Sequence, residues 1–261
     1  MLSEFDLSGQ VAIVTGGGTG IGRAIALLLA ERGADVALAA RRADKLEAVA
    51  QDIRALGRRA LCVPSDVRDP HSVQAMVGVV VAEWGRIDIL INNAGGAHRH
   101  IGLSKMTVEG WDRDIALNLS SAQYCSQAAF PHLRESRGNI VNISSMAGIN
   151  GTNGVGAYSA AKAGLQMLTR VMASEWGAHG IRVNCVAPGM TATEKAVEGW
   201  EKIGFDAATI AKSAFALGRY GEAREVAQMA VFFASPAASY ISGQTVAVSG
   251  GPKLGGMVEV D

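Results

Sequence analysis

The sequence predicts an α/β fold in which a doubly wound, seven-stranded parallel sheet carries helices on both faces. Short apolar runs alternate with longer helical patterns along the whole chain, and the short runs are almost continuously apolar. Strands of that kind are buried on both faces, as in parallel sheets. Because crossovers between parallel strands are right-handed, the alternation places helices on both sides of one sheet. The predicted strands are 11–15, 36–39, 60–63, 87–91, 139–143, 181–186 and 245–248.

The chain shows no sign of a domain boundary. Its 261 residues fit either one large α/β domain or two small ones. The loops between apolar segments are short, and none contains a Pro/Ser linker, a charge block or a low-complexity run. We therefore expect a single domain over residues 1–261.

Charge and the N-terminal sequence narrow the range of partners. Basic and acidic residues number 24 each and are spread along the chain, which argues against a nucleic-acid surface or an anionic-membrane patch. Residues 1–6 lack the basic and apolar regions of a signal peptide, and no apolar stretch is long enough to span a bilayer. A small-molecule partner and a cytoplasmic location are expected.

The three cysteines do not suggest a framework of disulfides or metal ligands. Cys62, Cys125 and Cys185 are far apart, and each lies in an apolar or helical stretch. The five histidines are scattered without metal-ligand spacing. We expect reduced core thiols and no metal site.

A glycine-rich segment, TGGGTGIGRA at residues 15–24, stands between the first predicted strand and the first predicted helix. Glycines permit a tight turn, let a pyrophosphate approach the backbone and leave its charge facing the positive end of the helix. Glycines alone would fit a structural turn equally well, but this position favours a Rossmann-type dinucleotide site. The expected contacts are Gly16, Thr19, Gly20, Ile21 and Gly22.

The second predicted strand is followed by Arg41 and Arg42. An NAD-selective enzyme usually carries Asp or Glu there for the ribose hydroxyls, whereas arginine can neutralise a 2′-phosphate. Asp44 is close in sequence but is expected to cap the next helix. The pattern favours NADP(H) over NAD(H), and the alternative is that both arginines are a solvated helix N-terminus.

Polar and small residues follow the third and fourth predicted strands. Asp66, followed by Val67, can accept a hydrogen bond from an adenine amino group or can cap a turn. Asn93, Ala94 and Gly95 follow the fourth strand. An asparagine there can bond the backbone of neighbouring loops, and small residues let a cofactor ribose lie close, so we expect both roles together.

Tyr158 and Lys162 lie near the start of the long helix predicted after the fifth strand. They are one helical turn apart and share a face. An ammonium held near a phenol favours phenolate, and an oxidised nicotinamide pushes the same way, so the pKa of Tyr158 is expected to fall toward the working pH. The Tyr-x-x-x-Lys spacing by itself is common by chance.

The motifs together resemble the short-chain dehydrogenase/reductase family, in order and over nearly the whole chain. They are Thr15-Gly16-x-x-x-Gly20-Ile21-Gly22, Asn92-Asn93-Ala94-Gly95, Ser145, Tyr158-x-x-x-Lys162 and Pro188-Gly189. The resemblance implies hydride transfer with a nicotinamide dinucleotide, Tyr158 as proton donor or acceptor, and Lys162 also bound to the nicotinamide ribose hydroxyls.

The resemblance extends the catalytic set by two residues. Ser145, thirteen positions before the tyrosine, matches the family serine that hydrogen-bonds the substrate carbonyl or alcohol. Ser144 competes for this role, and because adjacent strand residues point to opposite faces, only one should reach the site. Asn118 matches the helical asparagine that helps hold a water linking the lysine to solvent, although without the resemblance it would be taken for a helix-surface amide.

The segment after the sixth predicted strand has a family role and one departure from the family pattern. The resemblance places the residues after Pro188-Gly189 against the nicotinamide carboxamide, where Thr193 and the backbone near Met190 fit and Thr191 is the alternative. Many members end in Val-Asp-Gly-Gly, whereas this chain has Ser249 in place of the aspartate. The departure leaves the catalytic set intact.

Substrate choice is expected to lie in residues 96–100, 146–155 and 190–215, and residues 190–217 are predicted to form a lid. The apolar side chains of the lid either meet a partly apolar substrate or pack the lid onto the sheet. His98, Arg99 and His100 can meet an anionic group or be solvated loop residues. The apolar lid residues are Ala196, Val197, Trp200, Ile203, Phe205 and Ile210.

The expected activity is the interconversion of a carbonyl and a secondary alcohol, as in a 3-oxoacyl-thioester reductase or a ketone reductase. The alternatives are an NAD-linked alcohol, polyol or steroid dehydrogenase and an enoyl- or dienoyl-thioester reductase. A non-enzymatic dinucleotide sensor shares the fold, but a binding protein needs no proton relay.

The helices predicted over 111–133 and 157–177 are rich in Ala, Leu and Met beyond what covering a sheet requires. The resemblance implies that such helices pair between subunits and give a homotetramer. Residues 253–261 either reach a neighbouring subunit or are mobile.

Overall fold

The computed structural model describes residues 3–97 and 100–252, and its main feature is a seven-stranded parallel sheet. The strand order is β3-β2-β1-β4-β5-β6-β9, which confirms the predicted doubly wound sheet. A two-stranded sheet, β7-β8, lies outside it. The strands are β1 Val11–Thr15, β2 Asp35–Ala40, β3 Ala60–Pro64, β4 Ile89–Asn92, β5 Asn139–Ile143, β6 Arg182–Pro188, β7 Thr191–Ala192, β8 Gly221–Glu222 and β9 Thr245–Val248.

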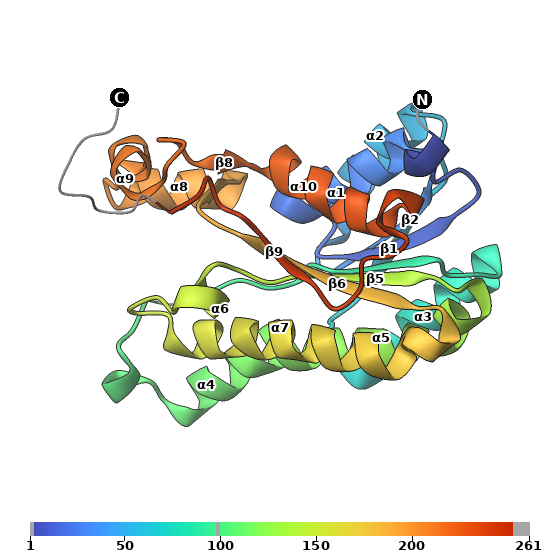
Figure 1. Cartoon of the computed structure of the whole chain (residues 1–261), viewed down its shortest axis with the longest axis horizontal. Coiled ribbons are helices and arrows are strands. Elements are labelled where there is room, and N and C mark those ends of the chain that lie inside the picture. Colours follow the sequence, from blue (N-terminus) through green and yellow to red (C-terminus); the bar gives the residue numbers. More distant parts are fainter. Residues whose placement is uncertain (1–2, 98–99, 253–261) are drawn as a thin grey trace.

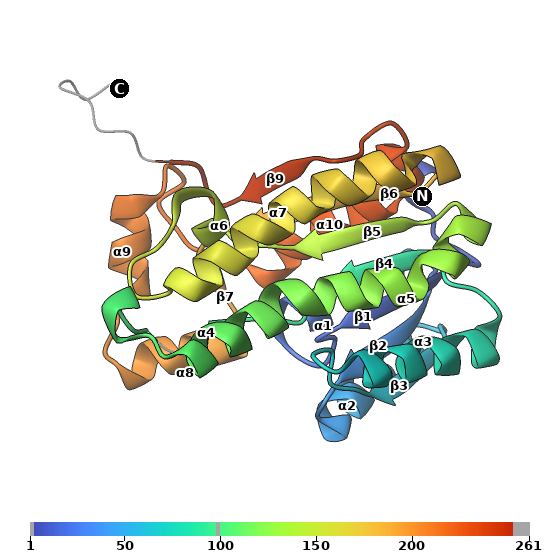
Figure 2. The same cartoon turned by 90° about the horizontal axis from the view of Figure 1, so that it is seen from below.

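Helices cover both faces of the sheet, with α1, α2 and α10 on one face and α3, α5 and α7 on the other (Figure 1). The smaller helices α4, α6, α8 and α9 lie toward one end of the molecule (Figure 2). The α-helices are α1 Gly20–Glu31, α2 Ala43–Ala55, α3 Pro70–Trp84, α4 Val108–Ile115, α5 Ser121–Ser136, α6 Ala147–Asn150, α7 Gly156–Trp176, α8 Glu194–Lys202, α9 Ala207–Ala214 and α10 Ala223–Ala234. Single turns are η1 Ser3–Phe5, η2 Leu103–Lys105, η3 Ala116–Ser120, η4 Gly177–His179 and η5 Pro236–Ala238.

The central strand β1 shows why its sequence is continuously apolar. Ala12 and Val14 pack into the core beneath α1 and α10, whereas Val11 and Ile13 pack into the core on the α3 and α5 side. Each of these side chains is at most 1% exposed. Successive side chains of a strand point to opposite faces, so two covered faces require apolar residues at every position.

The strand order reverses between β1 and β4, because the chain first builds outward through β2 and β3 and then returns to the other side of β1. Ligands of such sheets bind beyond the carboxyl ends of the strands at this reversal. Helices α8 and α9 and strand β7 lie beyond that end of the sheet (Figure 2).

Two predicted boundaries differ from the structure. Strand β4 begins at Ile89 rather than Ile87, because the Asp88 carboxylate accepts a hydrogen bond from the Val11 N–H at 2.8 Å and pairs with Arg86. The helix predicted over 111–133 is a series of three segments, α4, the π-helical turn η3 and α5.

The expected cap of α2 is wrong. The helix begins at Ala43 with Arg42 as its N-cap, and Asp44 lies in the first turn, where its charge favours the helix N-terminus without capping it.

The cysteines are free, and two of the three are buried. Cys125 and Cys185 are core residues, as predicted. Cys62 lies on the edge strand β3, is only partly buried, and donates a hydrogen bond to Glu47 with an Sγ–O distance of 3.5 Å. Among residues 3–97 and 100–252, no helix combines the length and the apolar character needed to cross a membrane.

Candidate active site

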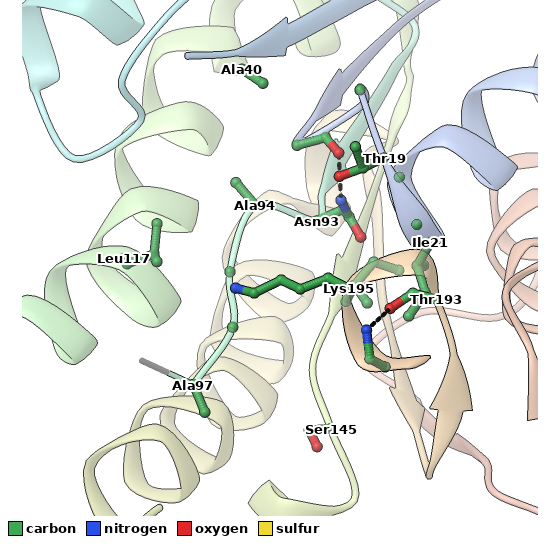
Figure 3. A pocket seen from close by; sticks show the side chains of 18 of the residues that line it. Thr19, Ile21, Ala40, Asn93, Ala94, Ala97, Leu117, Ser145, Thr193 and Lys195 are labelled. Atoms are coloured by element: carbon green, nitrogen blue, oxygen red, sulfur yellow. Dashed lines mark hydrogen bonds between the residues drawn. The ribbon is translucent and has the colours of Figure 1, made fainter. Parts of the chain in front are cut away.

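A cleft of about 760 Å³ lies at the carboxyl ends of the strands. It is lined by the glycine loop, the ends of β2, β3 and β4, the start of α7 and the first turns of α8. Figure 3 shows part of this lining, including Thr19, Asn93 and Ser145. The cleft contains every predicted cofactor residue, namely Gly16, Thr19, Gly20, Ile21, Gly22, Arg41, Arg42, Asp66, Val67, Asn93, Ala94, Gly95, Tyr158, Lys162, Pro188, Gly189, Thr191 and Thr193. Of the predicted catalytic residues, Ser145 also lines the cleft, whereas Asn118 lies behind its wall.

The glycine loop approaches the fourth strand too closely for side chains. A Cβ on Gly22 would lie 2.2 Å from the Gly16 carbonyl oxygen and 2.4 Å from Asn93 Nδ2. Gly16 and Gly20 have φ values of +65° and +55°, in the left-handed region that favours glycine. Loop and helix α1 therefore present bare backbone to the cleft, which fits the close approach of a dinucleotide diphosphate.

Asn93 fixes the glycine loop. Its Nδ2 donates to the Thr15 carbonyl oxygen at 2.9 Å and to the Gly16 carbonyl oxygen at 3.3 Å. The Thr15 hydroxyl in turn accepts from the Asn93 and Ala94 N–H groups. The prediction that an asparagine after the fourth strand bonds a neighbouring loop is confirmed.

Arginines surround one end of the cleft. Arg41 and Arg42 are exposed and line it, and Arg42 is also the N-cap of α2, so the two interpretations of these arginines are compatible. The Asp66 carboxylate accepts from the Arg68 N–H at 3.1 Å and pairs with the Arg68 guanidinium. This pairing lowers the pKa of Asp66 to about 2. The turn-capping role of Asp66 is confirmed, and its contact with adenine stays a prediction.

Tyr158 and Lys162 lie at the opposite end, on one face of α7. Lys162 Nζ is 5.7 Å from the centroid of the Tyr158 ring and donates to the Ile143 carbonyl oxygen at 2.8 Å. The lysine is 3% exposed, and burial lowers its pKa to about 8.

The expected fall in the pKa of Tyr158, which counted on both Lys162 and an oxidised nicotinamide, is not produced by the protein's own side chains. Burial raises the pKa of Tyr158, and a hydrogen bond with Ser145 offsets only part of that rise. Removing a phenolate from water opposes ionisation more strongly than the Ser145 hydrogen bond favours it. Tyr158 is therefore held as a neutral phenol, the form that donates a proton.

The side chains of the two serines after β5 point in different directions. Ser144 is buried, donates to the Lys162 carbonyl oxygen at 2.9 Å and accepts from Gln166 Nε2 at 3.0 Å. Ser145 lines the cleft, where its hydroxyl accepts from the Ala147 N–H at 3.1 Å and bonds Tyr158. Ser144 anchors α7 to the sheet, and Ser145 is the serine available to a ligand.

Asn118 is a buried residue, not a surface amide. It is 1% exposed in η3, and its Nδ2 donates to the Asp114 carbonyl oxygen at 3.0 Å and to the Gly96 carbonyl oxygen at 3.2 Å. Its Oδ1 accepts from the Gly96 N–H at 2.8 Å. A Cβ on Gly95 would lie 2.7 Å from Asn118 Oδ1 and 3.0 Å from Lys162 Nζ, so Gly95 fits between the two side chains only because it lacks one.

The segment after β6 closes the cleft. A Cβ on Gly189 would lie 2.8 Å from the Ser249 Cβ, so the serine that replaces the family aspartate packs directly on this turn. Thr191 donates to the Gly189 carbonyl oxygen at 3.1 Å, and Thr193 caps α8 by accepting from the Ala196 N–H at 3.2 Å. The Thr191 hydroxyl thus has its partner in the loop, and the Thr193 hydroxyl has its partner in the first turn of α8.

The apolar side chains of α8 and its neighbours divide between two roles. Ala196, Trp200 and Ile203 line the cleft, and the Trp200 ring also packs on Phe205 and Tyr220, with centroids 6.3 and 5.5 Å away. His100 lines the cleft as well, whereas His98, Arg99 and residues 253–261, for which the sequence suggests contacts, lie outside the described residues.

Four charged residues of the cleft were missed by sequence reasoning, namely Lys45, Arg68, Glu194 and Lys195. Lys195 points into the cleft in Figure 3. The Glu194 carboxylate accepts from the Gly20 N–H at 3.1 Å. These two residues are 174 positions apart, and no local pattern indicates such a contact.

The chain is similar to a known protein family and to known enzymes. A family model described as Enoyl-(Acyl carrier protein) reductase matches residues 16–253. The chain is 38% identical over 255 residues to 2-dehydro-3-deoxy-D-gluconate 5-dehydrogenase of Escherichia coli (strain K12), covering 96% of this chain and 98% of that protein.

Two solved structures are similar over nearly their whole length. One is 7α-hydroxysteroid dehydrogenase complexed with NADH and 7-oxo glycochenodeoxycholic acid, at a TM-score of 0.90 and 33% identity, covering 95% of this chain and 96% of that one. The other is L-sorbose reductase from Gluconobacter frateurii with NADPH and L-sorbose, at a TM-score of 0.92 and 30% identity, covering 95% of this chain and 98% of that one.

Fold, cleft and relatives define a Rossmann-type oxidoreductase. The chain belongs to the short-chain dehydrogenase/reductase family. It is an NAD(P)(H)-dependent oxidoreductase.

Proposed function

We propose that this enzyme is an NADP(H)-preferring reductase of ketones or 3-oxoacyl thioesters, with Asn118, Ser145, Tyr158 and Lys162 as its catalytic set. The observation that carries the proposal is one cleft with a glycine loop and arginines at one end and Ser145, Tyr158 and Lys162 at the other. A dinucleotide laid along the glycine loop brings its nicotinamide to the tyrosine end.

The roles follow from the contacts of each side chain. When bound, the dinucleotide supplies or accepts the hydride. Ser145 and Tyr158, whose hydroxyls are hydrogen-bonded, donate to the substrate oxygen, and Tyr158 transfers the proton. Lys162, held by the Ile143 carbonyl oxygen, lies beside Tyr158 and next to Gly95, and it would hold the ribose hydroxyls of the dinucleotide. Asn118 orients the Gly96 backbone behind this group.

The preference for NADP(H) is supported by Arg41 and Arg42, which line the cleft where the 2′-phosphate would lie. The double substitution Arg41→Ala/Arg42→Ala is expected to lower kcat/KM with NADPH about 10- to 100-fold, the range of charge-assisted hydrogen bonds, and to change kcat/KM with NADH much less. Steady-state kinetics with both cofactors provides the comparison. A wild-type preference for NADH would contradict the assignment.

The catalytic assignment is tested on a panel of ketones, 3-oxoacyl thioesters and secondary alcohols. Tyr158→Phe is expected to lower turnover at least about 100-fold, the usual worth of a general acid, while the Kd for NADPH changes little. Tyr124→Phe is the matched control, because Tyr124 packs against the core on the α3 and α5 side, away from the cleft. A Tyr158→Phe enzyme with near-normal turnover would refute the proton-donor role.

The same substrate panel tests two other candidate activities. The steroid and sugar substrates of the similar structures favour an alcohol or polyol dehydrogenase as the second candidate. The description of the matching family model favours an enoyl-thioester reductase as the third. A homotetramer is also proposed, with residues 190–217 as a substrate lid, and the cytoplasmic location stays a prediction.

A further inference from the structure

The first turn of the lid contacts the glycine loop. Glu194 is the first residue of α8, and its Oε2 accepts a hydrogen bond from the Gly20 N–H at 3.1 Å. Gly20 is the first residue of the 12-residue helix α1. The contact is close on both sides, because the Thr193 methyl carbon would lie 3.1 Å from a Cβ on Gly20.

The contact uses an N–H group that a bound diphosphate would also need. The N–H groups at the start of α1 carry the positive end of the helix, and they are the groups that hold the diphosphate in this fold. The Gly20 N–H has one hydrogen, so the Glu194 carboxylate and a phosphate oxygen cannot both be bonded by it at full strength. The Glu194 carboxylate and a phosphate group placed at the same N–H would also repel each other.

We propose that Glu194 is a latch that holds the lid on the glycine loop and that the dinucleotide diphosphate displaces it. Binding of the cofactor frees the first turn of α8 from Gly20, and departure of the cofactor lets the carboxylate return. Glu194 thereby weakens cofactor binding and speeds cofactor release. This inference rests on the proposed function, since it concerns the same cleft.

Glu194→Gln removes the charge and keeps the shape of the side chain. It is expected to lower the Kd for NADPH, measured by cofactor fluorescence, about two- to five-fold, and to slow NADPH dissociation by a similar factor. Glu198→Gln is the matched control, because Glu198 is exposed on the same helix and lines no part of the cleft. Adenosine 2′-phosphate, which has no diphosphate, should bind both variants like the wild type.

Glu194→Asp separates the latch from simple repulsion. It keeps the charge, but its shorter side chain loses the 3.1 Å contact with Gly20. The latch predicts that Glu194→Asp also binds NADPH more tightly than the wild type. Repulsion alone predicts no gain, and that result would overturn the latch.

Failure of the latch and failure of the proposed function give different results. NADPH affinities of Glu194→Gln and Glu198→Gln that match the wild type would overturn the latch and leave the proposed function standing. A wild-type enzyme that binds neither NADPH nor NADH would overturn the proposed function, and the latch with it.

Discussion

Lys162 lies close to several other residues of the site. Its ammonium is buried, donates to the Ile143 carbonyl oxygen and lies next to Gly95, which has no side chain. Burying a charge is costly, and the lowered pKa of about 8 is the measure of that cost. A charge kept there at the expense of stability is typical of a functional site.

The pH dependence of stability tests this cost. The pKa of Lys162 is about 8 in the folded chain and 10.5 when unperturbed, so between these values the unfolded chain binds more protons and stability rises with pH. Lys162→Met removes the ammonium. Its advantage in unfolding free energy over the wild type should be largest below pH 8 and fall by up to about 3 kcal/mol toward pH 10.5. Urea unfolding across this range gives the difference, and a constant difference would contradict the buried ammonium.

At the scale of elements, two irregular features shape the site. Helix α1 begins directly from the glycine loop and packs so closely on it that Gly22 touches the Gly16 backbone. The π-helical turn η3 separates α4 from α5 and carries Asn118 inward to the Gly96 backbone. Such turns are frequent at functional sites because the extra residue redirects side chains.

Gly22→Ala should therefore disturb the whole start of α1. The new Cβ would lie 2.2 Å from the Gly16 carbonyl oxygen, so loop and helix must separate. We expect the unfolding free energy to fall by about 1–3 kcal/mol and NADPH binding to weaken. Gly78→Ala in α3 is the matched control, since nothing lies within 4 Å of its Cβ position. That control should gain up to about 1 kcal/mol from helix propensity, as thermal and chemical unfolding would report.

At the scale of the whole molecule, α7 presents apolar side chains outward. Met167 and Val171 on α7 are 54% and 43% exposed, and Trp111 on α4 is 39% exposed. Apolar side chains that gather on one face of a protein mark an association surface, which supports the proposed pairing of long helices between subunits.

The double substitution Met167→Glu/Val171→Glu tests this surface. Wild-type enzyme is expected to run as a tetramer in size-exclusion chromatography with light scattering, and the variant as a smaller species, because charges would be buried between subunits. Val79→Glu is the control, since Val79 on α3 is exposed to 46% on another helix. A monomeric wild type would contradict the proposed tetramer.

The sequence by itself determined the sheet, the glycine loop and the shared face of Tyr158 and Lys162. These features depend on local periodicity and on which residue follows which strand, and both are visible along the chain. Strand positions were right to within two residues at each end. The predicted cofactor residues were brought into one cleft because the carboxyl ends of parallel strands meet at one edge.

Only the tertiary structure decided the rest. It separated Ser144 from Ser145, buried Asn118 and placed Glu194 on Gly20 across 174 positions. It also raised the pKa of Tyr158 by burial, where a neighbouring ammonium and an oxidised nicotinamide predicted a fall. Burial and long-range hydrogen bonds depend on which elements pack together, and that information is not contained in the residues next to each side chain.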